Sequence, residues 1–317
     1  FIPHSKDYFL PQILNAKYDP TITEHEDVDA FMLRVCDGEE DVVELMYEMI
    51  GYSLIPSAKF QKSFILFGEG SNGKSTLLDM VIALIGKKNT SSLSLSEINN
   101  GGHVLAEMTD KLINVGDDIS DEYIKDSSTF KKMVTGDGVM VARKYEHPYE
   151  LNNTATLMFA TNNLPNMRDK SNGMLRRLCV VPFNATITKD DPTYDPFIID
   201  KLTTDDALSY VLNRALDGLQ QVFINQGFTE PDVVKEIMDD YYREINNVIQ
   251  YLEVHGNGIV ESMVSQDAYS AYALWCATNA QVAYKLRRFN SEIRKLTGMD
   301  LENTRKNGEV VQVWKSK

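Results

Sequence analysis

A glycine-rich run carries the clearest chemistry in the chain. Residues 68–75 read Gly-Glu-Gly-Ser-Asn-Gly-Lys-Ser and fit the pattern G-x-x-x-x-G-K-[ST]. Glycines let backbone N–H groups surround phosphate oxygens, and a helix starting near Gly73 points its positive end at them. The run therefore predicts a site for ATP with Mg²⁺, although a glycine turn with a surface lysine is the alternative. The predicted nucleotide-binding residues are Gly68, Gly70, Ser71, Asn72, Gly73, Lys74, Ser75 and Thr76.

Two adjacent acids follow an apolar run further along the chain. Residues 111–115 read Lys-Leu-Ile-Asn-Val, and Gly116 leads into Asp117 and Asp118. An acid at the end of a strand beside a phosphate loop can hold Mg²⁺ through water, and a second can polarise the attacking water. We assign Asp117 to the metal and Asp118 to the water, with the roles exchangeable. The pair could instead cap a helix beginning after Ser120.

Three more polar residues stand at the ends of apolar runs. Asn162 follows residues 156–160, where a neutral amide can bond to the γ-phosphate and the water without adding charge repulsion. We prefer it to Asn163, although an asparagine-rich turn before Pro165 would give the same pattern. Arg176 and Arg177 precede residues 178–181. An arginine delivered across a subunit boundary can neutralise transition-state charge, whereas ion pairs with surface acids are the alternative.

Lys74 and Ser75 complete the predicted site. The lysine is placed to reach the β- and γ-phosphates, and the serine hydroxyl to complete the Mg²⁺ shell together with Asp117. The predicted catalytic residues are Lys74, Asp117, Asp118, Asn162, Arg176 and Arg177.

A parallel sheet would bring these residues together. Four short apolar runs are typical of buried strands, and helical stretches lie between them. Strands that alternate with helices indicate an α/β fold whose sheet is covered on both faces. A hairpin with a charged tip, Lys144-Tyr-Glu-His-Pro148, is predicted before the third run. The predicted strands are 63–67, 111–115, 156–160 and 178–181, the helices 74–85 and 121–134, and the hairpin arms 139–143 and 149–152.

The regions outside this core read as mainly helical. Helical spacing of apolar residues marks the N-terminal part and two long segments, 205–224 and 231–253. The last sixty residues show two helices, 266–278 and 285–296, and then two strands around Lys306-Asn-Gly308, which is the order of a winged-helix domain. We therefore divide the chain into a helical region 1–58, an α/β core 59–200, a helical segment 201–253 and a winged-helix-like domain 254–317.

Charge is strongly segregated along the 317 residues. The net charge is −14, but the segment 281–317 has nine Lys and Arg against four Asp and Glu. That segment therefore carries +5 and the remainder −19, so nucleic-acid contact must be confined to local patches. Three distant cysteines exclude a disulfide scaffold and fit a reducing cytosol, bacterial or of a virus-infected host. No apolar run reaches the ~18–20 residues of a membrane span.

Taken together, the motifs resemble those of the superfamily 3 helicases, and most of all the primase–helicases of phages, plasmids and poxviruses. The resemblance covers about residues 60–185. It implies an AAA+ P-loop fold, a hexameric ring with ATP at subunit interfaces, and 3′ to 5′ translocation on single-stranded DNA. Lys74 and Ser75 then look like the Walker A pair, Asp117 and Asp118 like Walker B, Asn162 like sensor 1, and Arg176 or Arg177 like the arginine finger.

The resemblance also implies surfaces that contact DNA. The hairpin tip looks like the channel hairpin that grips the single strand, since cations can pair with phosphates and rings can stack on bases. Glu146 weakens the charge argument, and an ordinary exposed tip is the alternative. The basic C-terminal unit resembles appended winged-helix domains that contact duplex DNA, although it could be a protein-contact module or a solvated basic helix. The predicted DNA-binding residues are Arg143, Lys144, Tyr145, His147, Arg287, Arg288, Arg305 and Lys306.

Three functions compete on these observations. The first is an ATP-driven DNA helicase acting in replication, and the second is a nucleotide-switched initiator that assembles on DNA without unwinding it. The third, a P-loop phosphotransferase, is disfavoured by the paired acids, the hairpin and the arginine pair. Relatives often carry a primase or polymerase module upstream, and a chain that opens with Phe1 rather than Met is expected to be cut from a longer protein.

Overall fold

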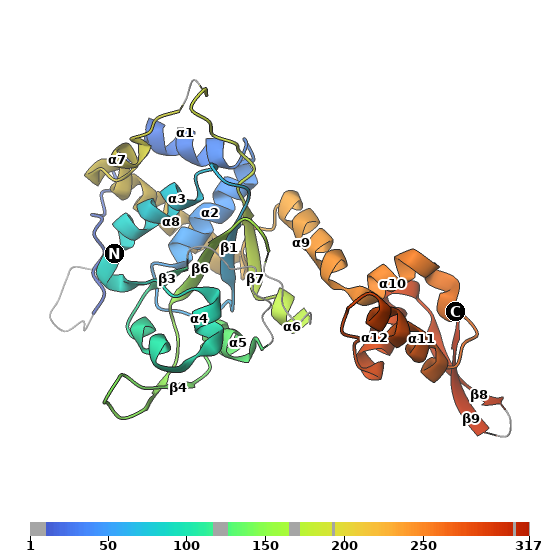
Figure 1. Ribbon diagram of the computed structural model, residues 1–317. Helices are drawn as coiled ribbons and strands as arrows, with labels where there is room; N and C mark the ends of the chain where they lie inside the picture. The colour runs from blue at the N-terminus through green and yellow to red at the C-terminus, as the bar shows by residue number, and fades with distance from the viewer. Residues whose placement is uncertain (1–10, 117–125, 165–171, 192–193, 307–308, 317) are drawn as a thin grey trace. The chain divides into compact units, whose positions relative to one another are not determined.

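The computed structural model forms two compact units, Phe1–Ile237 and Met238–Lys317 (Figure 1). Each unit has its own buried core, and we describe them separately. The structure describes residues 11–116, 126–164, 172–191, 194–306 and 309–316.

A five-stranded parallel sheet forms the centre of the first unit. The strand order is β2-β3-β6-β1-β7, so β1 pairs with both β6 and β7. Strands covered on both faces bury successive side chains, which explains why the sequence shows continuous apolar runs rather than alternation. All four predicted strands are confirmed, whereas the two-residue β2 was missed. The strands are β1 (Ser63–Phe67), β2 (Thr90–Ser91), β3 (Ile113–Gly116), β6 (Thr156–Thr161) and β7 (Leu178–Pro182).

Helices flank this sheet and pack closely on one another (Figure 1). The tightest approach is between α2 and α8, where a Cβ on Gly51 would lie 2.0 Å from the Ala215 carbonyl oxygen and one on Gly218 would lie 2.7 Å from the Glu48 nitrogen. Only glycine permits this contact. The helices are α1 (Glu26–Val35), α2 (Glu40–Tyr52), α3 (Lys74–Ile85), α4 (Leu95–Asn100), α5 (Ser128–Thr135), α6 (Asn172–Leu175), α7 (Ile198–Leu202) and α8 (Asp205–Asn225), with 3₁₀ turns η1 (Lys87–Asn89) and η2 (Gly102–Met108).

One helix of this unit starts later than the sequence predicted. The prediction was a helix over 121–134, but α5 begins at Ser128, and residues 117–125 lie outside the described part of the chain. The carboxylate of Asp126 accepts a hydrogen bond from the Ser128 backbone at 2.8 Å, and such a local turn competes with helix. The predicted hairpin is confirmed as β4 (Val139–Val141) paired antiparallel with β5 (Tyr149–Leu151).

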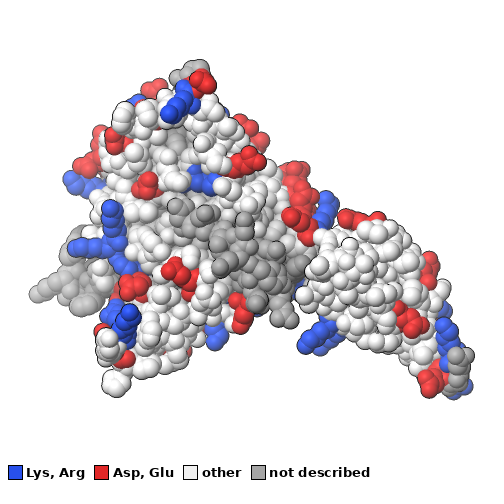
Figure 2. All heavy atoms as spheres, viewed as in Figure 1, with Lys and Arg blue, Asp and Glu red and all other residues white. Residues whose placement is uncertain are grey.

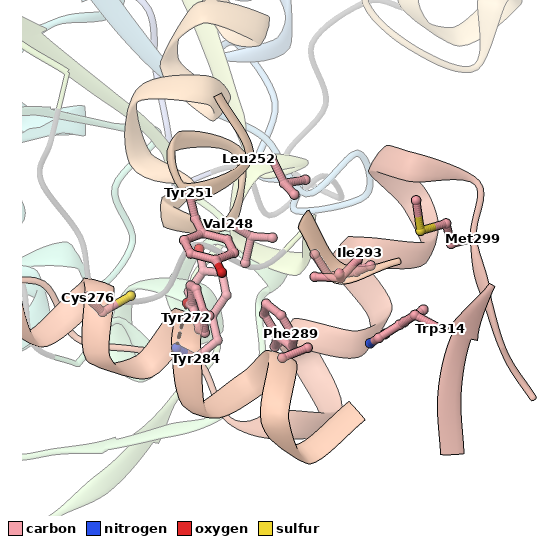
Figure 3. Close-up of a cluster of buried hydrophobic side chains, with 12 residues drawn as sticks. Val248, Tyr251, Leu252, Tyr272, Cys276, Tyr284, Phe289, Ile293, Met299 and Trp314 are labelled. Atoms are coloured by element: carbon pink, nitrogen blue, oxygen red, sulfur yellow. Dashed lines mark hydrogen bonds between the residues drawn. The ribbon is translucent and has the colours of Figure 1, made fainter. Parts of the chain in front are cut away.

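The second unit packs three helices and a hairpin around an aromatic core. Tyr272 stacks on Phe289 with ring centroids 4.6 Å apart, and its hydroxyl accepts a hydrogen bond from the Tyr284 backbone (Figure 3). The predicted order of two helices and a strand pair is confirmed, while a winged helix stays a prediction. The elements are α10 (Asn247–His255), the 3₁₀ turn η3 (Asn257–Val260), α11 (Ser265–Thr278), α12 (Leu286–Thr297), β8 (Asp300–Lys306) and β9 (Glu309–Lys315).

The predicted helix over 231–253 is wrong in one respect, because the structure has two helices there. α9 (Asp232–Ile245) runs from one unit into the other, and α10 starts two residues later. Asn246 separates them: its side-chain oxygen accepts a hydrogen bond from the Val248 backbone at 3.0 Å. Asparagine is a favoured N-cap, so it starts a new helix rather than continuing the old one.

Two further expectations concern membrane spans and cysteines. Among the described residues, no helix combines the length and the apolar character needed to cross a bilayer. Cys36, Cys179 and Cys276 are all buried and none of them forms a disulfide, and burial raises the pKa of the Cys36 and Cys179 thiols to about 12. Neither Cys36 nor Cys179 is therefore a reactive thiolate.

Candidate functional site

The phosphate loop joins the end of β1 to the start of α3. Ser71 and Gly73 both have left-handed backbones, with φ of 62° and 92°, and α3 starts at the next residue, Lys74. The Ser71 carbonyl accepts a hydrogen bond from the Ile187 backbone at 2.8 Å, which ties the loop to the segment after β7. α3 therefore begins at the loop, which places the positive end of its helix dipole there, as an anion site requires.

Lys74 is buried at 8% exposure, and its ammonium is surrounded by oxygen atoms. It donates to the carbonyls of Gly68 at 2.5 Å and Glu69 at 3.0 Å, and to the side-chain oxygens of Asn72 and Asn162 at 3.1 Å each. A buried cation is costly unless it is paired or hydrogen-bonded. This arrangement keeps the charge inside the loop, where phosphate oxygens could replace some of the present acceptors.

A cavity of about 430 Å³ opens beside this ammonium. Its volume is in the range of small-ligand pockets. The predicted residues Gly70, Ser71, Asn72, Gly73, Lys74, Ser75, Thr76 and Asn162 line it, together with Ala160 and Thr161, which the sequence reasoning did not select. The structure thus brings Asn162, the residue that follows β6, to the phosphate loop, as the sequence predicted.

Two packing contacts hold the loop in shape, and neither was predicted. A Cβ on Gly73 would lie 2.6 Å from Cγ1 of Val35 and 3.4 Å from the Phe31 ring, so α1 packs directly on the loop. Asn72 is buried, and its side-chain nitrogen donates to the Phe183 carbonyl at 3.0 Å. Asn72 therefore acts at least partly as a brace between the loop and the segment after β7.

The predicted Mg²⁺ ligands are only partly described. Ser75 lies exposed on the first turn of α3 and lines the cavity. β3 ends at Gly116, whose register partner is Phe159 on β6. The last described residue before Asp117 therefore lies toward the same edge of the sheet as the cavity. Asp117 and Asp118 themselves lie outside the described residues. Among the described residues, Ser75 is the predicted Mg²⁺ ligand that lines the cavity, and a hydroxyl oxygen is a ligand type that Mg²⁺ accepts.

The two arginines lie at the other edge of the sheet. The Arg177 carbonyl accepts a hydrogen bond from Ser63, the first residue of β1, whereas the phosphate loop follows the last residue of that strand. At about 3.3 Å per residue the strand separates the two edges by roughly 16 Å. Neither arginine can therefore reach the phosphate cavity of its own chain.

Burial distinguishes the two arginines. The Arg177 side chain is half-buried and donates to the Gly173 carbonyl, and its backbone nitrogen bonds to the Met174 carbonyl. Arg176 is exposed and makes no hydrogen bond or ion pair with any other described residue. Arg177 thus has a structural role in the chain, while Arg176 is open to a partner.

The hairpin tip is also near this second edge, and it is exposed throughout. β5 is followed within five residues by the start of β6, and Figure 1 shows β4 and α6 on the side of the sheet away from α1 and α7. Tyr145 is fully exposed with a left-handed φ of 69°. His103 on η2 donates a ring N–H to the Ala142 carbonyl at 2.7 Å, which fixes the base of the tip. The exposed tip residues are Arg143, Lys144, Tyr145, Glu146 and His147.

The cations of the C-terminal unit fall into two groups. Arg288 stacks on the Tyr284 ring at 3.8 Å, and Arg294 pairs with Asp300 at 2.7 Å. Arg287, by contrast, is exposed on α12 without a partner among the described residues. Arg305 and Lys306 are exposed near the β8–β9 tip, where basic and acidic side chains lie together (Figure 2).

Comparisons with known proteins agree with this fold. Residues 66–177 match a family of unknown function, DUF5906. Solved structures of the C-terminal region of NrS-1 are similar: two apo structures have a TM-score of 0.53 and a third 0.52, each 13% identical and covering 95% of this chain and 79% of that chain. At this identity the similarity concerns the fold alone. It extends well beyond the segment that matches the family.

Proposed function

We propose that this chain is an AAA+ ATPase motor that uses ATP hydrolysis to move along single-stranded DNA during replication, as a superfamily 3 helicase does. One observation carries the proposal: the buried Lys74 ammonium, the start of α3 and Asn162 from a neighbouring strand converge on one cavity. The first residues of α3 supply the cationic and backbone groups there, and the residue after β6 supplies the amide group. That combination suits a nucleoside triphosphate and the water that attacks it.

The role of each residue follows from where it lies. Lys74 neutralises the β- and γ-phosphates, Ser75 and Asp117 hold Mg²⁺, and Asp118 and Asn162 orient the attacking water. Mg²⁺ supplies charge neutralisation on the phosphates. The loop residues that line the cavity, Gly70, Ser71, Asn72, Gly73 and Thr76, supply backbone N–H groups to the phosphates.

A second copy of the chain completes this site in the proposal. Arg176 is about a strand length from its own cavity, and its guanidinium is open to a partner. An arginine that acts in trans on the next subunit's phosphates accounts for both facts. Cyclic head-to-tail contacts close into rings, and the family resemblance favours six subunits. Arg176 is therefore our choice for the finger over Arg177.

DNA contact is assigned to two surfaces. The hairpin tip combines Arg143 and Lys144 for phosphates with Tyr145 and His147 for bases, and all four are exposed. The exposed Arg287, Arg305 and Lys306 form the duplex-contacting group on the C-terminal unit, while Arg288 is already stacked on Tyr284. The similarity to the NrS-1 C-terminal region supports a shared fold with that region.

One assay tests the proposal against the other two functions. Purified chain is given ATP and Mg²⁺ with and without single-stranded DNA, and strand displacement is followed on a forked duplex. We expect DNA-stimulated hydrolysis and displacement. Hydrolysis and DNA binding without displacement would favour the initiator, and phosphate transfer to a small acceptor without DNA would favour the phosphotransferase. Absence of any ATP hydrolysis under all conditions would refute the motor.

A further inference from the structure

The hairpin that carries the exposed tip has a short stem. β4 and β5 pair over three residues each, from Val139 opposite Leu151 to Val141 opposite Tyr149. A two-stranded hairpin by itself is at best marginally stable in water. Val141 and Leu151 are buried and anchor the stem, whereas residues 143–148 are all exposed. The three pairs of the stem therefore do not by themselves fix the direction in which the tip points.

The 3₁₀ turn η2 is hydrogen-bonded to both ends of the loop between these strands. His103 donates from Nδ1 to the carbonyl of Ala142, the residue that follows β4, at 2.7 Å. At the other end, the hydroxyls of Thr109 and Tyr149 are 2.7 Å apart and share one hydrogen bond. Tyr149 is the first residue of β5, so both bonds lie where the loop leaves the stem. One element thus holds the loop at its two ends.

The geometry of η2 accounts for this double contact. η2 runs over seven residues, Gly102–Met108, with Thr109 as its C-cap, and 3₁₀ runs of this length are uncommon. With three residues per turn, His103 and Thr109 lie on the same face, about 12 Å apart along the axis. In an α-helix the same spacing would turn them about 120° away from each other. Leu105 and Met108 are buried, which fixes η2 on the core of the first unit.

We propose that η2 holds the DNA-contacting loop in one orientation, with His103, Thr109 and Tyr149 as positioning residues. This inference rests on the proposed contact between the hairpin tip and single-stranded DNA. None of the three residues has to touch DNA. They hold the backbone of the loop before the strand arrives, so less conformational freedom is lost when the side chains of the tip engage it.

Two substitutions remove the same hydrogen bond from its two sides. Tyr149→Phe and Thr109→Val each delete one hydroxyl and keep the overall shape of the side chain. Each is expected to raise the oligothymidine concentration that half-maximally stimulates ATP hydrolysis by about threefold, the scale of one hydrogen bond. The double variant should be no worse than either single variant, because only one bond is lost. Hydrolysis without DNA should stay within about twofold, since neither residue lines the phosphate cavity.

The bond from the other end of the loop is tested through His103. His103→Ala combined with Tyr149→Phe removes both bonds and should raise the half-maximal oligothymidine concentration by about tenfold. His103→Asn keeps an N–H at the δ position and should behave like the wild type. Tyr47→Phe is the matched control, because the Tyr47 hydroxyl has no hydrogen-bond partner among the described residues. Hydrogen exchange of residues 139–151 should accelerate in the variants that lose a bond, with or without DNA.

The outcomes separate this inference from the function on which it rests. If Tyr145→Ala weakens DNA stimulation while His103→Ala with Tyr149→Phe does not, the tip contacts DNA without η2 and only this inference fails. It also fails if the effects of Thr109→Val and Tyr149→Phe add in the double variant, because the two hydroxyls then do not form one bond. If Tyr145→Ala has no effect either, the hairpin is not the DNA contact, and the proposed function loses this surface together with the inference.

Discussion

The two edges of the five-stranded sheet hold their cations in opposite ways. At the phosphate edge Lys74 is buried and bonded to four oxygen atoms, three from the loop and one from Asn162, the residue that follows β6. At the other edge Arg176 and the hairpin cations are exposed, and Arg176 has no partner among the described residues. The cation at the phosphate edge is thus held in place before a ligand binds, whereas the exposed cations at the other edge are not.

This difference matches the size of the ligand that each edge is proposed to bind. A small ligand binds tightly when its site is already ordered, because little side-chain freedom is lost on binding. Exposed cations lose that freedom only when a large partner covers them, such as a second subunit or a DNA strand. The phosphate edge should therefore keep its function in an isolated chain, while the opposite edge should act only in an assembly.

Loss of the buried cation should have the largest effect. Lys74→Ala removes the only side-chain cation among the described residues that line the phosphate cavity, so ATP hydrolysis is expected to be abolished. Steady-state phosphate release measures this, and a circular dichroism spectrum like that of the wild type serves as the folding control. Normal turnover in this variant would refute the assignment of the nucleotide site.

The exposed arginine should be needed for hydrolysis but not for binding. Arg176→Ala is expected to bind ATP normally and to lose about a thousandfold in turnover, the scale of an arginine finger. Arg177→Ala should instead lower thermal stability, since its guanidinium bonds to the Gly173 carbonyl. The two arginines thus separate a role in trans from a role in folding.

Mixing two inactive variants tests the subunit boundary. Lys74→Ala chains still carry Arg176, and Arg176→Ala chains still carry an intact phosphate loop. When the two are mixed, an active site can form where they meet, so partial turnover should return. If the variants assemble together and stay inactive, Arg176 does not act across the interface.

The sequence allowed much of the phosphate edge to be predicted, for a physical reason. The loop spacing, the strand before it and the helix after it are local features, and parallel strands bring their carboxyl ends to one edge, so Asn162 could be placed beside Lys74. Long-range packing has no such local signal. The contact of Val35 with Gly73 joins segments far apart in sequence, and no motif indicates it.

Burial was the other property that the sequence did not reveal. Arg176 and Arg177 are identical neighbours in sequence, yet only one is bonded into the fold. The break in the helix at Asn246 is different, because asparagine favours N-caps and the signal was present. Helical periodicity continues on both sides of Asn246, and by itself this periodicity predicts one uninterrupted helix.

The hairpin tip should matter for DNA and not for nucleotide. Tyr145→Ala removes a fully exposed ring, and loss of one base stack is expected to raise the single-stranded DNA concentration needed for half-maximal ATPase stimulation by about tenfold. Tyr145→Phe keeps the ring and should behave like the wild type. ATP affinity should be unchanged in both. Equal stimulation of all three proteins would exclude stacking by this residue.

In the C-terminal unit, exposed cations and cations that already pair with an acid should also differ, and we expect a weaker effect there on the affinity for duplex DNA. Arg287→Ala combined with Arg305→Ala should lower duplex affinity and reduce the slope of log affinity against log salt by about 0.9 for each DNA phosphate that the variant no longer neutralises. Arg294→Ala is the matched control, since that cation already pairs with Asp300. Fluorescence anisotropy at several salt concentrations measures this. A larger effect of Arg294→Ala would reverse the assignment.

The smallest expected effect concerns a buried acid, Glu48, which is hydrogen-bonded as Lys74 is but carries the opposite charge when ionised. Glu48 on α2 is 2% exposed and accepts hydrogen bonds from the Thr229 backbone at 2.6 Å and hydroxyl at 2.8 Å. Burial raises its pKa above the usual value of 4.5, despite these bonds. Folding therefore favours the protonated form of Glu48. The contribution of this group to the free energy of unfolding is full below pH 4.5 and is lost as the pH rises through the raised pKa.

Glu48→Gln should remove this dependence, because the amide does not titrate. As the pH rises from about 4.5 to 7, the melting temperature of the wild type is expected to fall relative to that of the variant by on the order of 2 °C. The comparison cancels the other carboxyl groups, since both proteins carry them. A difference that stays constant over this range would mean that Glu48 remains charged throughout, with the Thr229 bonds outweighing its burial. A buried anion would then be held in the same way as the buried cation, by hydrogen bonds alone.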